Sequence, residues 1–109
     1  MKKLIVCTLA LLVAGVVSVR AADASETWAK DCAKCHGPDG TGKTKMGAKL
    51  GVKDYTDPKV QASFTDDQLA KAIKEGIKEG DVTKMKAFGD TLSDAEIKGL
   101  VAYIRAFKK

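Results

Sequence analysis

The chain has 109 residues and a formal net charge of +5, with 19 Lys and Arg against 14 Asp and Glu. Three basic residues (Lys2, Lys3 and Arg20) lie in a predicted leader, so the remainder has 16 basic and 14 acidic residues and a formal charge of +2. That balance, without a basic patch of interleaved aromatic residues, argues against a nucleic-acid partner, and so short a chain forms a single domain with a small core.

Residues 1–21 are predicted to be a secretory signal peptide. Lys2 and Lys3 precede an apolar run from Leu4 to Val17 that contains no acidic residue. A run of 14 residues is too short for a comfortable membrane span, which needs about 20. We therefore expect export to the periplasm, with an uncleaved N-terminal anchor as the competing interpretation.

Cleavage is predicted after Ala21, with cleavage after Ala24 as the alternative, because both sites have small residues at the positions that signal peptidase recognises. Cys7 would leave with the leader, so Cys32 and Cys35 would be the only cysteines of the mature chain. Residues 22–109 are then the one folded domain.

A short helix is predicted from Ser25, a candidate N-cap, to the pentapeptide Cys32-Ala33-Lys34-Cys35-His36. Positions i, i+3 and i+4 of a helix share one face, so Cys32, Cys35 and His36 would point toward the same bound object. Two thiols and a histidine at this spacing form the attachment site of a c-type haem. The thiols would add across the haem vinyl groups, and His36 would bind the iron from one side.

The cysteine pair alone has other interpretations, namely a thioredoxin-like redox site, half of a zinc site, or a simple disulfide. A redox pair should lie near a βαβ pattern, and no such run of strand-like segments appears in the sequence. A structural zinc needs four ligands, whereas the mature chain offers two cysteines and one histidine. Haem attachment is favoured, and the disulfide and the metal site stay open.

The middle of the chain is marked by turn and capping residues. The glycine-rich segment from Gly37 to Gly47 is predicted to be an irregular loop. Asp57-Pro58 predicts a helix of one or two turns through Ser63, because proline suits the first helical position. The capping box Thr65-Asp66-Asp67-Gln68 predicts a helix that stops at Gly76.

A second capping box, Ser93-Asp94-Ala95-Glu96, predicts a C-terminal helix. Its apolar residues have the i, i+3, i+4, i+7 spacing of an amphipathic helix and are expected in the core: Ile97, Leu100, Val101 and Ile104. The segment from Ile77 to Thr91 has no sustained period and is predicted to be a long irregular loop, either functional or disordered.

The chain has one histidine, so a second ligand to the iron must be methionine, lysine, an amino terminus or water. Met46 follows His36 closely and is expected on the same side of the haem, whereas Met85 can fold across the opposite face. The charged neighbours Lys84 and Lys86 are unusual for a core residue, so we predict Met85 as the sixth ligand. A thioether favours ferrous iron and would raise the reduction potential.

With these features the chain resembles the class I c-type cytochromes, in particular the small bacterial monohaem members, over essentially the whole mature length. That family has an aromatic residue four positions before the first cysteine, where this chain has Trp28. The family's Gly-Pro-x-Leu element reads Gly47-Ala48-Lys49-Leu50 here, and Leu50 would pack on the haem. The family's Met-Pro-Ala-Phe element reads Met85-Lys86-Ala87-Phe88.

The resemblance implies further contacts. The Ala48 carbonyl would accept a hydrogen bond from His36 and set its tautomer, with less rigidity than the family's proline provides. The C-terminal helix would cross the first helix and bring Tyr103 near Trp28. Tyr55 would either form a hydrogen bond with a haem propionate or lie at the surface.

We therefore expect an all-α domain of four to five short helices wrapped around one covalently attached haem c, with His36 and Met85 as axial ligands. The expected function is one-electron transfer in the periplasm, not catalysis. A haem peroxidase or gas sensor with a labile sixth ligand is the alternative, and a cysteine-based thiol oxidoreductase is a third possibility.

The expected partners are a redox donor and a redox acceptor, and the protein itself is expected to be a monomer without a membrane span in its mature chain. Lysines near the haem edge would steer such partners, or would be ordinary solvated side chains: Lys43, Lys45, Lys84 and Lys86.

Overall fold

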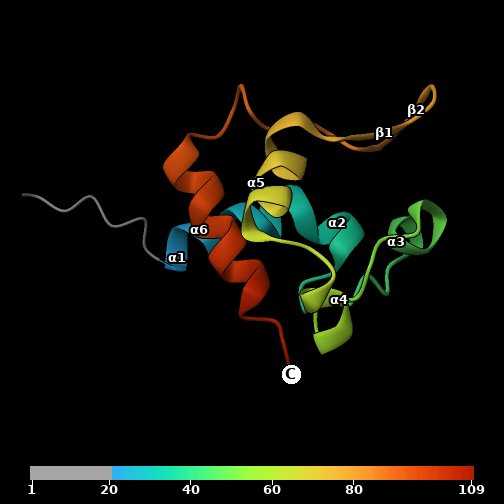
Figure 1. Cartoon of the computed structure of the whole chain (residues 1–109), viewed down its shortest axis with the longest axis horizontal. Helices are drawn as coiled ribbons and strands as arrows, with labels where there is room; N and C mark the ends of the chain where they lie inside the picture. Colours follow the sequence, from blue (N-terminus) through green and yellow to red (C-terminus); the bar gives the residue numbers. More distant parts are fainter. Residues whose placement is uncertain (1–20) are drawn as a thin grey trace, which may run out of the picture.

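The computed structural model describes residues 21–109, so the predicted signal peptide, with Cys7, lies outside the described residues except for Ala21. The elements are α1 (Ala21–Thr27), the π-helical turn η1 (Trp28–Cys32), α2 (Ala33–His36), α3 (Lys45–Leu50), α4 (Pro58–Ala62), α5 (Asp66–Glu75), β1 (Ile77–Glu79), β2 (Val82–Met85) and α6 (Asp94–Arg105) (Figure 1). The expected helical fold is confirmed in the main, but the two strands show that the chain is not strictly all-α.

The N-terminal elements α1, η1 and α2 follow one another without a break from Ala21 to His36. The predicted helix start at Ser25 is therefore wrong. Ala24 is only 4% exposed and belongs to the core, and this packing holds the turn before Ser25 in a helix that alanine already favours. The predicted end at the cysteine motif is confirmed, because Gly37 follows with a φ of +82° that cannot continue the helix.

The turn η1 is wider than an α-helical turn. The N–H of Ala33 bonds to the carbonyl of Trp28, five residues earlier. Turns of this kind occur frequently at functional sites. Trp28 is buried in the core, whereas Cys32 at the end of the turn is only half-buried.

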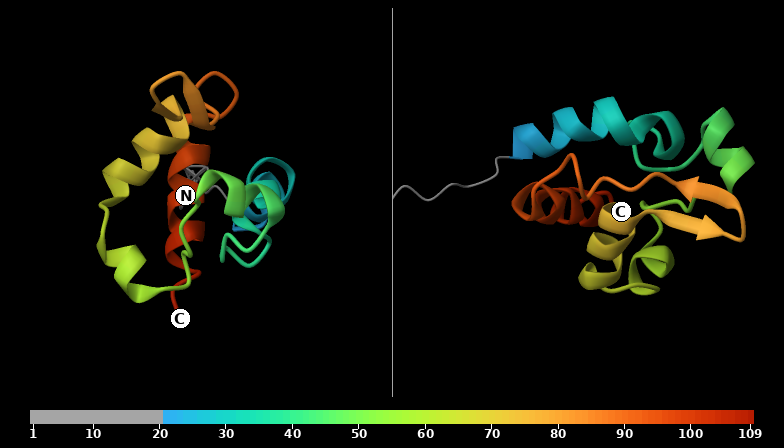
Figure 2. Two further views of the ribbon diagram at one scale, coloured as in Figure 1. Left: turned by 90° about the vertical axis from the view of Figure 1, so that its right-hand side faces the viewer. Right: turned by 90° about the horizontal axis from the view of Figure 1, so that it is seen from above.

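Helix α6 is the centre of the packing and contacts α1 on one side and α5 on the other (Figure 2). All four of its predicted core residues are buried, and they meet buried residues of the other elements: Ala24, Trp28, Leu69 and Ile73. Both predicted capping boxes are formed, with Thr65 accepting from the Gln68 N–H and Ser93 accepting from the Glu96 N–H. Capping chemistry and apolar spacing together therefore account for the two longer helices.

Two shorter helices lie between the cysteine motif and α5. The predicted helix after Asp57 is confirmed as α4, with the Asp57 side chain accepting from the Lys59 N–H. Helix α3 corrects the prediction of an irregular loop from Gly37 to Gly47, because the helix already begins at Lys45 inside that segment. Thr44 caps it by accepting from the Gly47 N–H, and Gly51 ends it in the left-handed conformation.

The strands β1 and β2 pair antiparallel inside the segment predicted to be irregular, which corrects that prediction. The hairpin turns at Gly80, where φ is +60°, and Val82 and Thr83 then supply the β-branched residues that strands favour. In Figures 1 and 2 the hairpin extends to the same end of the molecule as α3.

No helix within residues 21–109 combines the length and the apolar character that crossing a membrane requires.

Candidate cofactor site

One cavity of about 630 Å³ is lined by all four residues predicted to hold a cofactor: Cys32, Cys35, His36 and Met85. Its walls come from the cysteine motif, the end of α3, helix α5 and the hairpin. The volume falls in the range of pockets that bind small molecules, about 300 to 1,000 Å³. Sequence positions far apart thus meet around a single space.

Most of the cavity wall is apolar. Leu50 lies in it, as the family resemblance implied, together with other apolar residues: Val52, Phe64, Leu69, Ile73, Ile77 and Phe88. Of the predicted lysines, Lys84 and Lys86 line the cavity, whereas Lys43 and Lys45 are not among its lining residues. Lys53 lines it as well.

The two thiols are free and half-buried. Burial, followed by the charges of Asp31 and Cys35, raises the pKa of Cys32 to about 12. The attacking thiol of a redox enzyme needs a lowered pKa, since the thiolate is the nucleophile. The environment of Cys32 therefore argues against a thiol oxidoreductase, and Cys32 and Cys35 are not joined by a disulfide.

His36 is held by aromatic rings. Its ring centroid lies 5.3 Å from that of Tyr55, with the planes inclined by 20°, and 5.4 Å from that of Trp28, with the planes inclined by 38°. Burial lowers the pKa of His36 and favours the neutral imidazole, which is the form that binds metals.

The Nδ1 atom of His36 is buried and has no hydrogen-bond partner in the described part of the chain. The predicted bond to the Ala48 carbonyl is thus not formed. Ala48 lies inside α3 and donates its N–H to the Thr44 carbonyl at 2.9 Å, a bond that proline cannot make. Alanine lets the helix continue through position 48. A carbonyl inside a helix points along the helix axis and so is not directed sideways at a neighbouring ring.

Helix α3 is packed closely on the cysteine motif. The Thr44 hydroxyl donates to the Cys35 carbonyl at 2.7 Å. A Cβ atom at Gly47 would collide with the Cys35 and Gly42 carbonyls, so only glycine fits there. The start of α3 is therefore fixed against the backbone of the predicted attachment site.

Met85 is the last residue of β2 and is half-buried against the core. Met85 pairs with Ile77 of β1. An antiparallel hairpin, and not an irregular loop, therefore places Met85 at the cavity. Lys84 pairs with Glu79 across the hairpin at 3.8 Å. Met46 lies in α3 and does not belong to the cavity lining.

Two aromatic predictions are settled by the structure. Tyr103 lies 5.7 Å from Trp28 between ring centroids, which confirms the predicted crossing. Trp28 also donates its indole N–H to the Gly37 carbonyl at 2.9 Å and so ties the helix to the turn that follows it. Tyr55 is half-buried and lines the cavity, so its placement at the surface is wrong.

The part of the chain that the structure describes gives no support for a zinc site. Among residues 21–109, the His, Cys, Asp and Glu side chains form no group of three that is suited to a metal ion.

Comparison with known proteins identifies the family. Residues 19–104 match the family described as cytochrome c oxidase, cbb3-type, subunit III. The chain belongs to this family of c-type cytochromes. No curated protein matched the cytochrome.

Solved structures agree with this assignment. The structure titled KustC0563 c-type cytochrome is 34% identical and superposes with a TM-score of 0.71, covering 79% of this cytochrome and 98% of that chain. A structure of a point mutant of Kustc0563 is also 34% identical, with a TM-score of 0.69, covering 79% and 99% of the two chains.

The residues of this cytochrome fit the covalently bound haem that a c-type cytochrome carries. Two free thiols and a neutral imidazole line one largely apolar cavity. A thioether is available in the same cavity from Met85. Thiols, imidazole and thioether are the donor set that such a haem takes from the chain.

Proposed function

We propose that this cytochrome holds one haem c through Cys32 and Cys35, binds its iron with His36 and Met85, and passes single electrons between redox proteins. The observation that carries the proposal is the shared cavity, which brings these four side chains together and leaves Met46 outside. When bound, the haem supplies a one-electron couple at its iron.

Each side chain has a distinct task. The thiols of Cys32 and Cys35 anchor the cofactor, and the imidazole of His36 supplies a neutral nitrogen ligand. The thioether of Met85 is a soft and neutral ligand that favours the reduced state. If His36 and Met85 both bind the iron, peroxide or a diatomic gas would have to displace a protein ligand, and this favours the carrier over the peroxidase or sensor.

The apolar wall contributes by excluding water. Leu50 ends α3, Val52 follows it, and Phe64 lies between α4 and α5. Ile73 of α5 and Phe88 after the hairpin add to the same wall. An apolar surrounding controls solvent access and thereby the reduction potential. Little solvent then has to rearrange when the charge changes.

Three lysines line the cavity and are proposed to face the redox partners: Lys53, Lys84 and Lys86. Positive groups at this place would attract an acidic partner surface and increase the rate of encounter. The expected result is that electron transfer slows as ionic strength rises, and that Lys53→Ala and Lys86→Ala weaken this salt dependence.

We also propose that residues 1–21 are removed and that the cytochrome acts in the periplasm. Ala24 is 4% exposed within the core, so cleavage after Ala24 would remove a packed residue, whereas cleavage after Ala21 retains it. The intact mass of the exported holoprotein should therefore correspond to a chain that starts at Ala22. A chain that starts at Ser25 would contradict this assignment.

The function is tested on purified protein by three linked measurements. The red colour should survive denaturation and extraction with acidified organic solvent, because thioether bonds are covalent, and it should be lost from Cys32→Ser/Cys35→Ser. Voltammetry should give a reversible one-electron wave. The ferrous protein should not bind carbon monoxide, and binding of carbon monoxide by the wild type would instead favour the sensor.

A further inference from the structure

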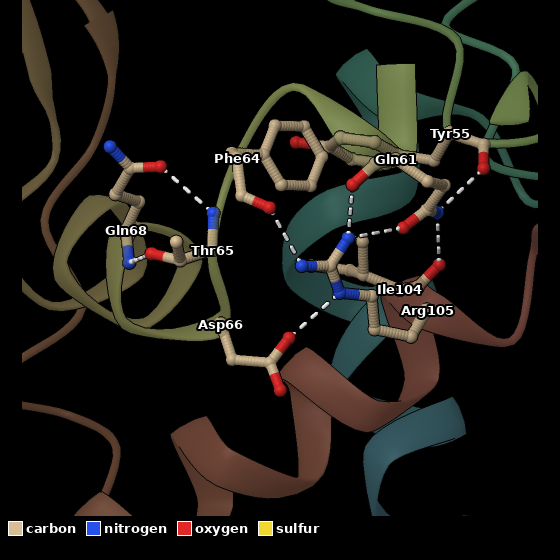
Figure 3. Close-up of polar contacts among 8 residues, drawn as sticks. All are labelled: Tyr55, Gln61, Phe64, Thr65, Asp66, Gln68, Ile104 and Arg105. Atoms are coloured by element: carbon tan, nitrogen blue, oxygen red, sulfur yellow. Dashed lines mark hydrogen bonds and ion pairs between the residues drawn. The ribbon is translucent and has the colours of Figure 1, made fainter. Parts of the chain in front are cut away.

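One buried polar side chain forms a hydrogen bond with the backbone of Tyr55, a residue that lines the cavity. Gln61 in α4 is only 5% exposed, and its amide nitrogen donates to the Tyr55 carbonyl at 2.7 Å and to the Ile104 carbonyl at 2.9 Å (Figure 3). Burial of an amide is costly unless its hydrogen bonds are made. Because these bonds are directional, Gln61 fixes the Tyr55 backbone relative to the end of α6.

Arg105 holds Gln61 in turn. The guanidinium donates to the Gln61 side-chain oxygen at 3.0 Å and also to the Gln61 backbone carbonyl. It further donates to the Phe64 carbonyl at 2.8 Å and pairs with Asp66 at 2.7 Å (Figure 3). The planar fork of arginine suits such a set of fixed acceptors, and lysine does not reproduce it.

The Tyr55 backbone is therefore restrained at both of its polar groups. Its N–H donates to the Gly40 carbonyl at 2.9 Å, and its carbonyl accepts from Gln61. With the backbone held, the ring is directed onto the imidazole of His36, the nearly parallel neighbour described above. The contacts thus run from Arg105 through Gln61 and Tyr55 to His36.

This connection matters because His36 lacks the usual means of orientation. A ligating histidine is normally oriented by a hydrogen bond from its other ring nitrogen. Here Nδ1 has no such partner in the described chain, and aromatic rings are what restrains the imidazole.

We propose that Gln61, clamped by Arg105, is a positioning residue that sets the orientation of the His36 imidazole through the ring of Tyr55. The proposal rests on the proposed binding of iron by His36. Neither Gln61 nor Arg105 lines the cavity, so both act through Tyr55.

The test uses the ferric holoprotein and the proton NMR shifts of the haem methyl groups, which depend on the orientation of the axial imidazole plane. Gln61→Met removes the amide while keeping the length of the side chain. Tyr55→Leu removes the stacked ring, whereas Tyr55→Phe keeps it. Ser93→Ala is the matched control, because it removes the cap of α6 and lowers stability away from the site.

Gln61→Met and Tyr55→Leu are expected to change the pattern of methyl shifts, and Tyr55→Phe and Ser93→Ala are expected to keep the wild-type pattern. The double variant Gln61→Met/Tyr55→Leu should change the pattern of methyl shifts no more than Tyr55→Leu alone, since the effects of residues that act in series are not additive. If Gln61→Met does not fold, Arg105→Lys replaces it, with a smaller change in the same direction expected.

The proposal is overturned if Tyr55→Leu keeps the wild-type pattern, or if Tyr55→Leu changes it while Gln61→Met or its substitute does not. A Ser93→Ala pattern as altered as that of Gln61→Met would also overturn it, because general loosening would then suffice. The wild-type spectrum is recorded first. Absence of a low-spin, six-coordinate ferric haem there would contradict the proposed function itself, not this inference.

Discussion

The imidazole of His36 stacks on the phenol ring of Tyr55 at a centroid distance of 5.3 Å, with only 20° between the planes. Aromatic pairs of this kind contribute about 0.5–1.5 kcal/mol beyond the area they bury. Trp28 adds a second ring at 5.4 Å. A proposed iron ligand is thus restrained by packing at the place where the family resemblance implied a hydrogen bond.

The close contact at Gly47 predicts a strong effect of a single methyl group. In Gly47→Ala the new Cβ would collide with the Cys35 and Gly42 carbonyls, and neither backbone group can give way easily. Gly51→Ala is the matched control, because Gly51 has φ +70° and nothing near its Cβ position, so alanine there costs about 1–2 kcal/mol.

Urea unfolding of the two holoproteins measures the difference. Gly47→Ala is expected to lose more unfolding free energy than Gly51→Ala, and to yield less mature protein. Equal losses would show that α3 is not packed on the cysteine motif as described.

Restoring the family's proline at position 48 is expected to destabilise this chain. Ala48→Pro would remove the N–H that bonds to the Thr44 carbonyl and would crowd that carbonyl, a change that costs about 3 kcal/mol inside a helix. Ala48→Ser keeps the N–H and is the control. Stability that is unchanged or increased in Ala48→Pro would contradict the helical assignment of this segment.

The loop that carries Tyr55 is predicted to weaken in acid. The side chain and then the N–H of Thr56 donate to Asp54, at 2.6 and 2.9 Å, and lower the pKa of Asp54 from its ordinary 3.8. A carboxyl whose pKa is lower in the folded state adds stability above its unfolded pKa, and this stability is lost as pH falls through the folded pKa.

The comparison is between the wild type and Asp54→Asn, each unfolded by urea over a series of pH values. The wild type should be more stable at about pH 6, and the difference should shrink as the pH falls below about 4. A difference that stays constant over that range would show that the carboxylate contributes nothing through Thr56.

Local chemistry explains which parts of this fold could be predicted. The capping boxes at Thr65 and Ser93 each act within four residues, so α5 and α6 were predicted with their starts. The spacing of Cys32, Cys35 and His36 likewise needs no knowledge of the rest of the chain. These features are decided by neighbours in sequence.

The remaining features depend on contacts between distant segments. Strands of three and four residues are too short to show a period, and their pairing places Met85. The ring of Tyr55 reaches His36 only after the chain has turned through α3. The bond from Arg105 to Gln61 spans 44 positions, and no local pattern reports it.

Met85 is the proposed second protein ligand of the iron, together with His36. The decisive measurement is the methionine-to-iron charge-transfer band at the red end of the ferric absorption spectrum, recorded for wild type, Met85→Ala and Met46→Ala. We predict that the band is present in the wild type and in Met46→Ala and absent from Met85→Ala. A band that survives in Met85→Ala, or disappears in Met46→Ala, would show that Met85 is not the ligand.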